Sequence, residues 1–157
     1  RVKGLAAHRG RFIGITDTAS AAALAHALPA WVDQTPALRE LTAQGFAGST
    51  VKHGGESPMP GVSCATAGIV IGALQMPDRI LLVVNNTGER AVGSAAITLD
   101  MNALGLAPKL PWQDFIGVRD LAAKTGTAPS ALSYPAGVLT VKDIAAHGGR
   151  LVMIRRY

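Results

Sequence analysis

The sequence predicts a mainly β protein: an antiparallel β-sandwich over about residues 62–157, preceded by a short helical or α/β segment. The first observation is Ile80–Val84, an unbroken run of apolar side chains that suits a strand buried on both faces. The second is the spacing of turn signals after residue 61, which separates short strand patterns as in a sandwich. The third is the pair Pro36 and Gly45, which mark the beginning and the end of a helix.

The composition is that of a folded globular protein. With 157 residues the chain forms one domain, or one domain and a fragment, and hydrophobic residues (48%) far outnumber charged ones (16%). The net charge is +5, but the basic residues are not interleaved with aromatic ones, so we expect no nucleic-acid partner. No apolar stretch is long enough to cross a bilayer, so we expect no membrane partner. Cys64 is the single cysteine, which excludes an internal disulfide.

Residues 1–45 are expected to form a helical segment. A short strand is predicted at Arg11–Thr16, and a helix over Ala19–Val32 that Pro29 ends or kinks. A second helix is predicted with Thr35 as its N-cap, Pro36 at its first position and Gly45 as its stop. Residues 46–60 are rich in glycine and proline and have no apolar period, so we interpret them as a linker before a sandwich domain at 61–157.

The sandwich is predicted to contain two hairpins. The first spans Asp78–Asp100, where Asn85–Gly88 supply turn residues and the return strand alternates, with Ala95, Ile97 and Leu99 on one face. The last hairpin pairs Val138–Ile144 with Arg150–Arg155. The remaining expectations are one bent strand or two over Val62–Gln75, with Gly68 and Gly72 at the bends, a helical turn at 101–106, a strand at 115–121 and a polar loop at 124–133.

The sequence contains no clear catalytic or metal-binding motif. The histidines at positions 8, 26, 53 and 147 are isolated, and no glycine-rich phosphate loop is present, so we expect no metal and no cofactor. Lys124–Thr127 and Ser49–Lys52 match two elements of penicillin-recognising serine enzymes. Glycines at positions 54 and 55 break the helix that this serine and lysine would need, so we interpret both segments as polar loops.

Three aromatic residues are the candidate ligand-binding side chains. Trp31, Trp112 and Tyr134 are the ones suited to stack on a sugar ring, and Trp112 lies in the proline-flanked segment KLPWQDF. Packing in the core or at a hinge is the competing interpretation for each. Asp17, after the first predicted strand, is the single acid placed as in a barrel active site, which leaves a small independent enzyme as a further alternative.

Residues 62–157 resemble the C-terminal β-sandwich of barrel-type glycoside hydrolases, as found in α-galactosidase-like and α-amylase-like families. The resemblance is carried by short pieces in the same order along the chain: Asn85-Asn86, Leu99-Asp100, Leu104-Gly105-Leu106, Val118-Arg119-Asp120-Leu121 and His147-Gly148. The alanine- and leucine-rich helices at residues 18–45 resemble the end of such a barrel.

This resemblance implies an accessory role. In these enzymes the catalytic acids lie in the barrel, which needs about 250 residues, so no catalytic residue is assigned in this chain. The expected function is that of a C-terminal piece or small subunit of a glycoside hydrolase, with a catalytic barrel or large subunit as partner and an oligosaccharide as a further ligand. The alternative is a standalone β-sandwich module that binds glycan or protein.

Overall fold

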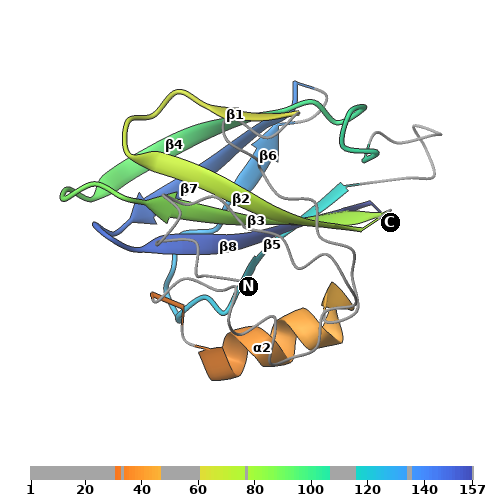
Figure 1. Ribbon diagram of the computed structural model, residues 1–157, viewed down its shortest axis with the longest axis horizontal. Coiled ribbons are helices and arrows are strands. Elements are labelled where there is room, and N and C mark those ends of the chain that lie inside the picture. The colour runs from red at the N-terminus through yellow and green to blue at the C-terminus, as the bar shows by residue number, and fades with distance from the viewer. Residues whose placement is uncertain are drawn as a thin grey trace, which may run out of the picture.

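The computed structural model describes residues 31–32, 34–46, 61–76, 78–106, 116–133 and 136–156. Within these ranges there is one helix and there are eight strands (Figure 1). Their bounds are α2 Gln34–Ala43, β1 Val62–Cys64, β2 Ile69–Met76, β3 Arg79–Asn86, β4 Val92–Leu99, β5 Ile116–Leu121, β6 Ala131–Ser133, β7 Val138–Ile144 and β8 Gly149–Arg156.

The strands form two four-stranded sheets, and the helix adds a third layer (Figure 1). The sheet that we name the outer sheet has the order β1-β4-β7-β6, and the one that we name the middle sheet has the order β2-β3-β8-β5. Every pairing among the described strands is antiparallel. The predicted antiparallel β-sandwich preceded by a helical segment is therefore confirmed.

Strand β3 is buried on both faces, as its sequence predicts. Ile80, Leu82 and Val84 face the outer sheet and belong to the large core between the two sheets. Leu81 and Val83 face the opposite way, into a second core under α2. Burying each of these side chains stabilises the fold by about 1.5–3 kcal/mol. A strand can be continuously apolar here because both of its faces are covered.

Strand β4 shows the predicted alternation. Ala95, Ile97 and Leu99 are buried in the core between the sheets, whereas Ala96 and Thr98 are exposed on the other face of the outer sheet. This alternation is typical of an antiparallel sheet with one face in solvent. The outer sheet is therefore covered on one side only.

The predicted hairpin over Asp78–Asp100 is wrong, because its two strands lie in different sheets. β3 pairs with β2 and β8, and β4 pairs with β1 and β7. Residues 87–91 cross from the middle sheet to the outer sheet instead of closing a tight turn. The burial pattern gives the physical reason. Strands that pair in one sheet have the same layers above and below them, whereas β3 is covered on both faces and β4 is covered on one.

The predicted last hairpin is wrong for the same reason, since β7 belongs to the outer sheet and β8 to the middle sheet. Its crossover lies beside the first one. The Asn86 backbone N–H donates to the Gly148 carbonyl (2.8 Å), and the His147 N–H donates to the Gly88 carbonyl (3.2 Å). The buried Asn86 side chain donates to the carbonyls of Arg90 (2.8 Å) and Ile144 (3.3 Å). One amide thus fixes both crossovers.

The hairpin that does form joins β2 to β3, in a register that runs from Ile69↔Asn86 to Met76↔Arg79. The stretch Val62–Gln75 forms two strands rather than one bent strand, and β1 and β2 lie in different sheets. Gly68, between them, has a φ of +82°, a conformation that favours glycine. Of the two bend points that the sequence indicates, this glycine occupies the connection and Gly72 lies within β2.

Most of the smaller expectations agree with the structure. The turn at 101–106 includes a bond from the Leu104 N–H to the Asp100 carbonyl (3.0 Å), and β5 matches the predicted strand. The polar loop at 124–133 ends in the short strand β6. The second predicted helix is α2, which begins at Gln34, so that Thr35 lies inside it, and Gly45 beyond its end has a φ of +85°. The strand at 11–16, most of the helix at 19–32, Asp17 and residues 47–60 lie outside the described residues.

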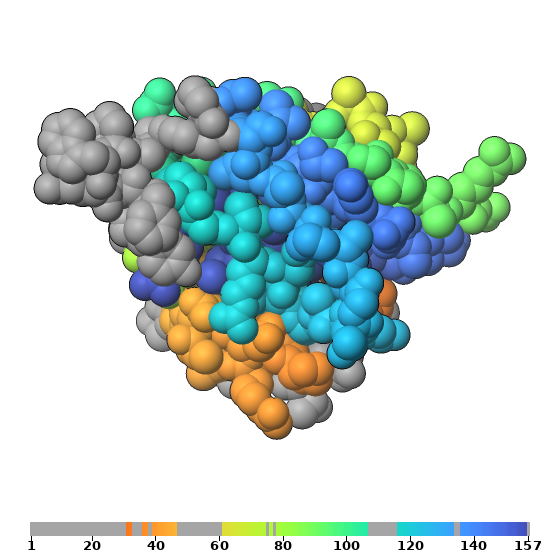
Figure 2. All heavy atoms as spheres, turned by 180° about the vertical axis from the view of Figure 1, so that it is seen from behind, coloured from red at the N-terminus to blue at the C-terminus, as the bar shows by residue number. Residues whose placement is uncertain are grey.

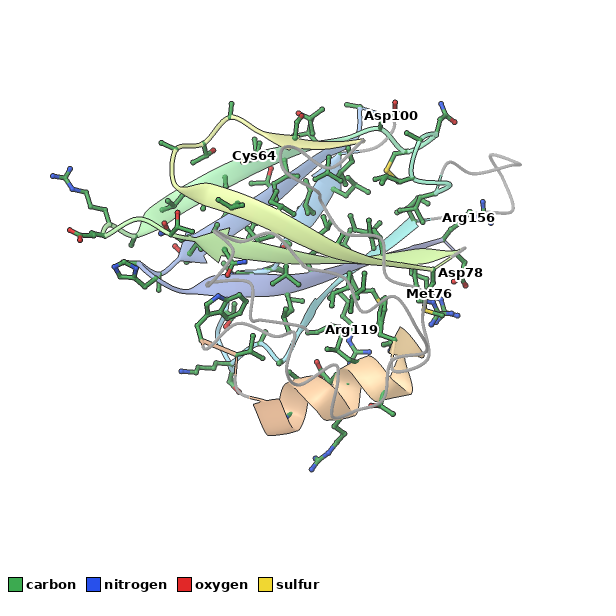
Figure 3. All side chains as sticks on the ribbon, viewed as in Figure 1. Cys64, Met76, Asp78, Asp100, Arg119 and Arg156 are labelled. Carbon is green, nitrogen blue, oxygen red and sulfur yellow. The ribbon has the colours of Figure 1, made fainter. Side chains whose placement is uncertain are left out.

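Helix α2 covers the face of the middle sheet that points away from the outer sheet (Figure 1). Seen from behind, its residues (orange) lie next to those of β5 and the segment after it (cyan; Figure 2). Ala37, Leu41 and Phe46 are fully buried there against strands β2, β3, β5 and β8. The helix is also held by Arg79, whose Nη1 donates to the Gln44 carbonyl (2.6 Å), and by Glu40, which pairs with Arg119 (3.5 Å). Figure 3 places Arg119 between the middle sheet and α2. These contacts position the segment that leads into the helix.

Candidate functional site

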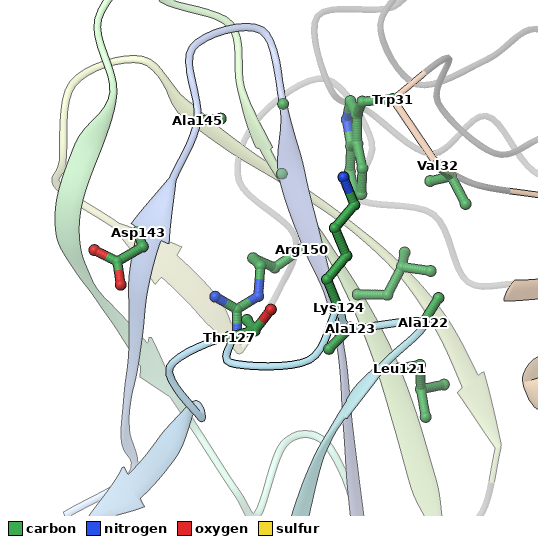
Figure 4. Close-up of a pocket in the computed structure, with 13 residues that line it drawn as sticks. Trp31, Val32, Leu121, Ala122, Ala123, Lys124, Thr127, Asp143, Ala145 and Arg150 are labelled. Carbon is green, nitrogen blue, oxygen red and sulfur yellow. The ribbon is translucent and has the colours of Figure 1, made fainter. Parts of the chain in front are cut away.

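A pocket lies at the end of the sandwich where the crossovers meet the segment that precedes α2 (Figure 4). Its volume is ≈ 310 Å³. We name it the Trp31 pocket. Its wall is made by Trp31 and Val32, by the segment that follows β5, by the end of β7 and by the start of β8, and its polar lining residues are Lys124, Thr127, Asp143 and Arg150.

Trp31 is held firmly at the wall of this pocket. Its indole Nε1 donates a hydrogen bond of 2.6 Å to Oδ1 of Asn85, at the end of β3. Its ring also packs over Gly149, where an added Cβ would lie 2.5 Å from Cζ2 of the ring. Glycine at 149 therefore makes room for the indole. The ring is partly exposed, so it is available to the pocket and fixed in orientation.

Arg150 forms a buried ion pair beside the pocket. Its Nη2 lies 2.7 Å from Oδ1 of Asp120, and the two side chains are 9% and 10% exposed. The guanidinium also donates to the carbonyls of Lys142 (2.8 Å) and Ala128 (2.7 Å). The Asp120 carboxylate accepts two further bonds from Ser130, one from the backbone N–H (2.8 Å) and one from the hydroxyl (2.7 Å). The network satisfies both buried charges and fixes the guanidinium in place.

Backbone strain is concentrated at this end of the molecule. Ala122, Asp143 and His147 are the described non-glycine residues with positive φ, at +54°, +53° and +53°. The first two line the pocket. The N–H of Ala122 donates to the Glu40 carboxylate, which ties this strained position to α2. Left-handed backbone at such residues costs about 1–3 kcal/mol each and is frequent at functional sites.

The pocket has a mixed apolar and polar lining. Its lining combines an aromatic ring, apolar side chains such as Leu121 and Leu151, two cations and the hydroxyl of Thr127. Asp143 is the one carboxylate among the described lining residues, and Figure 4 shows its carboxylate pointing away from Arg150. No group of histidine, cysteine and acidic side chains among the described residues is arranged to hold a metal ion. Cys64 is a free thiol, partly buried at the edge of the core between the sheets.

Of the three predicted ligand-binding residues, Trp31 lines the pocket. Trp112 and Tyr134 lie outside the described residues. The segment Lys124–Thr127, interpreted as a loop, is a turn in which the Thr127 N–H donates to the Lys124 carbonyl (3.1 Å). Sequence reasoning missed Arg150; the signal was an arginine at the start of the apolar run Leu151–Ile154.

Comparisons with protein-family models, with curated proteins and with solved structures give no match to this chain. Among the described residues no helix has the length and apolarity that crossing a bilayer requires.

Proposed function

We propose that this chain is an accessory β-sandwich piece, or small subunit, of a carbohydrate-active enzyme of the glycoside hydrolase class. In this proposal it packs on a catalytic barrel formed by other polypeptide. The short pieces between Asn85 and Gly148 that resemble such sandwiches give the enzyme class. One structural observation carries the docking role: the two sheets have outward faces of opposite character.

The outer sheet presents small and polar side chains to solvent. Ser94, Ala96, Thr98 and Lys142 are all exposed on its outward face. The middle sheet instead presents apolar side chains, which are buried under α2: Leu74, Leu81, Val83, Leu151 and Met153. An antiparallel sheet needs one buried face to be stable, so the second apolar face of the middle sheet serves packing against helices.

This asymmetry fits a sandwich mounted on a barrel, because the outer layer of a (β/α)₈ barrel is a ring of helices. In this proposal α2 is a helix of that ring and the middle sheet is the face that contacts it. The segment that ends in Phe46 would then join the two parts, since this side chain is fully buried against the middle sheet.

The pocket supports assigning catalysis elsewhere. Hydrolysis of a glycosidic bond uses two carboxyl groups about 5–10 Å apart. Among the described lining residues the exposed Asp143 is the single carboxylate, and the buried carboxylate of Asp120 is bound to Arg150 and Ser130. Within the part of the chain that the structure describes, no second free carboxylate lines the pocket beside Asp143.

Intact-mass analysis of the native protein, purified through an antibody to the sandwich, tests this proposal. We expect either a precursor longer than 16.1 kDa or a stoichiometric larger chain, with glycosidase activity in the same fraction. Peptide sequencing of that larger polypeptide must identify a (β/α)₈ catalytic domain. A monomer of 16.1 kDa without an associated chain contradicts the proposal.

The Trp31 pocket favours a second candidate, a standalone module that binds glycan or protein. A free 16.1 kDa monomer that binds oligosaccharide in solution is the result expected for this candidate. The two candidates therefore differ in the size of the native species, whereas binding at the pocket is compatible with both.

A further inference from the structure

We propose that the Trp31 pocket binds a single sugar ring that carries a carboxylate, a hexuronic acid residue. The inference rests on the carbohydrate part of the proposed function, but not on the catalytic barrel. It follows from the size of the pocket, the fixed indole and the donors that face the same space.

The size of the pocket suits one ring. Its volume of ≈ 310 Å³ lies at the lower end of the range for small-molecule sites, roughly 300–1,000 Å³. The walls contributed by Val32, Leu121 and Leu151 are apolar, and Trp31 adds an aromatic surface. A pyranose ring has an apolar face of C–H groups that packs on such a surface, while its hydroxyls point to the rim.

The orientation of the indole is set before any ligand arrives. The bond to Asn85 and the contact with Gly149 hold the ring of Trp31 from two sides. A side chain that is already ordered loses little conformational freedom on binding. The pocket thus has the fixed aromatic wall that a weakly apolar ligand such as a sugar requires.

The donors in the pocket suit a carboxylate. A guanidinium carries five N–H groups, and Arg150 uses three of them, for Lys142, Asp120 and Ala128. The described residues supply no acceptor for the other two, and Arg150 lines the pocket. These two are the Nε–H and one Nη1–H, which lie on opposite edges of the guanidinium. One of them can therefore donate a single charge-assisted hydrogen bond to a carboxylate oxygen in the pocket.

The positive charges of Lys124 and Arg150 are equal in number to the negative charges of Asp120 and Asp143, so an anion is favoured over a neutral sugar by the direction in which these groups point. Asp120 neutralises the charge of Arg150, and the exposed ammonium of Lys124 then adds a positive charge at the rim. Thr127 contributes a hydroxyl from the same turn. In Figure 4 Thr127 lies at the guanidinium end of Arg150 and the Lys124 side chain runs toward Trp31, whereas the Asp143 carboxylate points away from Arg150. The three inward groups are therefore donors.

The test is a titration of the full chain with sugars, monitored by amide NMR and by tryptophan fluorescence. The probes are D-glucuronate and D-galacturonate, with D-glucose, D-galactose and acetate as comparisons. We expect at least one uronate to bind about tenfold more tightly than its neutral sugar and than acetate, as a charge-assisted hydrogen bond implies. Shifted amides should include those of Gly149 and Lys124. Binding should weaken as salt is added.

Variants locate the interaction. Lys124→Gln should weaken uronate binding about fivefold or more and weaken binding of the neutral sugar less, because it removes the positive charge at the rim. Lys142→Gln is the matched control: this lysine is equally exposed but its side chain lies on the outward face of the outer sheet, and it should bind like the wild type. Both variants are at surface positions and should fold normally.

Three outcomes overturn the inference: neutral sugars bind as tightly as uronates, acetate binds as tightly as uronates, or the two lysine variants lose affinity equally. The second outcome would make the pocket a general anion site. Absence of any sugar binding, together with a barrel-containing partner in the native material, refutes this inference and leaves the accessory role intact. Uronate binding by a free monomer refutes the accessory role and supports the inference.

Discussion

The indole N–H of Trp31 donates a 2.6 Å hydrogen bond to the side-chain oxygen of Asn85, a residue 54 positions further along the chain. Asn85 is 3% exposed, and its amide nitrogen has no hydrogen-bond partner among the residues that the structure describes. The segment before α2 is therefore joined to the end of β3 through a buried amide that is only half satisfied. This contact links the wall of the pocket to the middle sheet.

We expect Trp31→Phe to lower the free energy of unfolding by about 1–3 kcal/mol, because the buried oxygen of Asn85 loses its donor. The double variant Trp31→Phe/Asn85→Leu should be more stable than Trp31→Phe alone, since leucine removes the unsatisfied amide. Urea denaturation of the four proteins in this cycle measures the coupling. Simple additivity of the two single effects would show that the hydrogen bond has no energetic role.

Gly149 is required by the close approach of its neighbours. A Cβ at this position would overlap the Val84 carbonyl oxygen and lie 2.5 Å from the Trp31 ring. Gly149→Ala should therefore lower the melting temperature strongly and change the fluorescence of Trp31. Gly93→Ala is the matched control, because nothing lies within 4 Å of a Cβ there and β4 is exposed at this point. Equal melting temperatures for the two variants would contradict the packing of the indole on Gly149.

Removing only one partner of the buried Arg150–Asp120 ion pair is expected to lower the free energy of unfolding strongly. Arg150→Met leaves a buried carboxylate without its cation, which costs about 3–5 kcal/mol. Adding Asp120→Asn removes the stranded charge while keeping an acceptor for Ser130. The double variant should thus be more stable than Arg150→Met in thermal and chemical unfolding. If the double variant is less stable than both single variants, the stabilisation comes from the hydrogen bonds that the Asp120 carboxylate accepts and not from its ion pair.

The sequence predicts the burial of individual strands well, because burial depends on the pattern of apolar and polar residues within each strand. The run Ile80–Val84 and the alternation at Ala95–Leu99 both correspond to the observed strands. Which strands pair is a long-range property, and there the local turn signal at Asn85–Gly88 was misleading. Asn86 uses its amide to bind Arg90 and Ile144 across a crossover, whereas the prediction took the same residues for a tight turn.

The candidate site depends still more on distant residues. Trp31 can be chosen from the sequence as a candidate ligand-binding residue because aromatic side chains are few in this chain. Arg150 and Asp120 cannot, because they are 30 positions apart and no local period relates them. The residue type of Ala122 does not indicate its positive φ, and its hydrogen bond to the Glu40 carboxylate joins residues far apart in the sequence. A pocket built by four separate segments is visible only after the fold is known.

Asp78 gives the stability a dependence on acid pH. The hydrogen bond from Arg79 lowers the pKa of this carboxyl below its ordinary value of 3.8, and the charges of Arg79 and Arg155 act in the same direction. Figure 3 shows Asp78 at the same end of the sheets as Met76. Because the folded-state pKa is the lower one, the stabilisation is complete above pH 3.8 and is lost as the pH falls through the folded value.

The measurement is the melting temperature as a function of pH. Between about pH 5 and pH 2, the wild type should lose more stability than Asp78→Asn, whose amide does not titrate. Above about pH 5 the wild type should be the more stable of the two. Parallel profiles over the whole range would show that the contacts between Asp78 and the two arginines do not favour the ionised form.

The final prediction concerns the helix that covers the middle sheet. Leu41 is fully buried in the second core, so Leu41→Ala should lower the free energy of unfolding by about 2–5 kcal/mol. Thr42→Ala, one position along the same helix but exposed, should change stability by less than about 0.5 kcal/mol. If α2 is an integral layer of the fold, Leu41→Ala will be clearly less stable than Thr42→Ala in both urea and thermal unfolding.

The same comparison decides how the middle sheet is used. Loss of the Leu41 side chain should expose Leu81 and Val83 to solvent more often, which raises binding of a hydrophobic dye and protease cleavage near α2. A Leu41→Ala protein as stable as Thr42→Ala would mean that the helix rests on the sheet without stabilising it. The apolar outward face of the middle sheet would then have to be covered by another element. The docking role that we propose for α2 would belong to that other element.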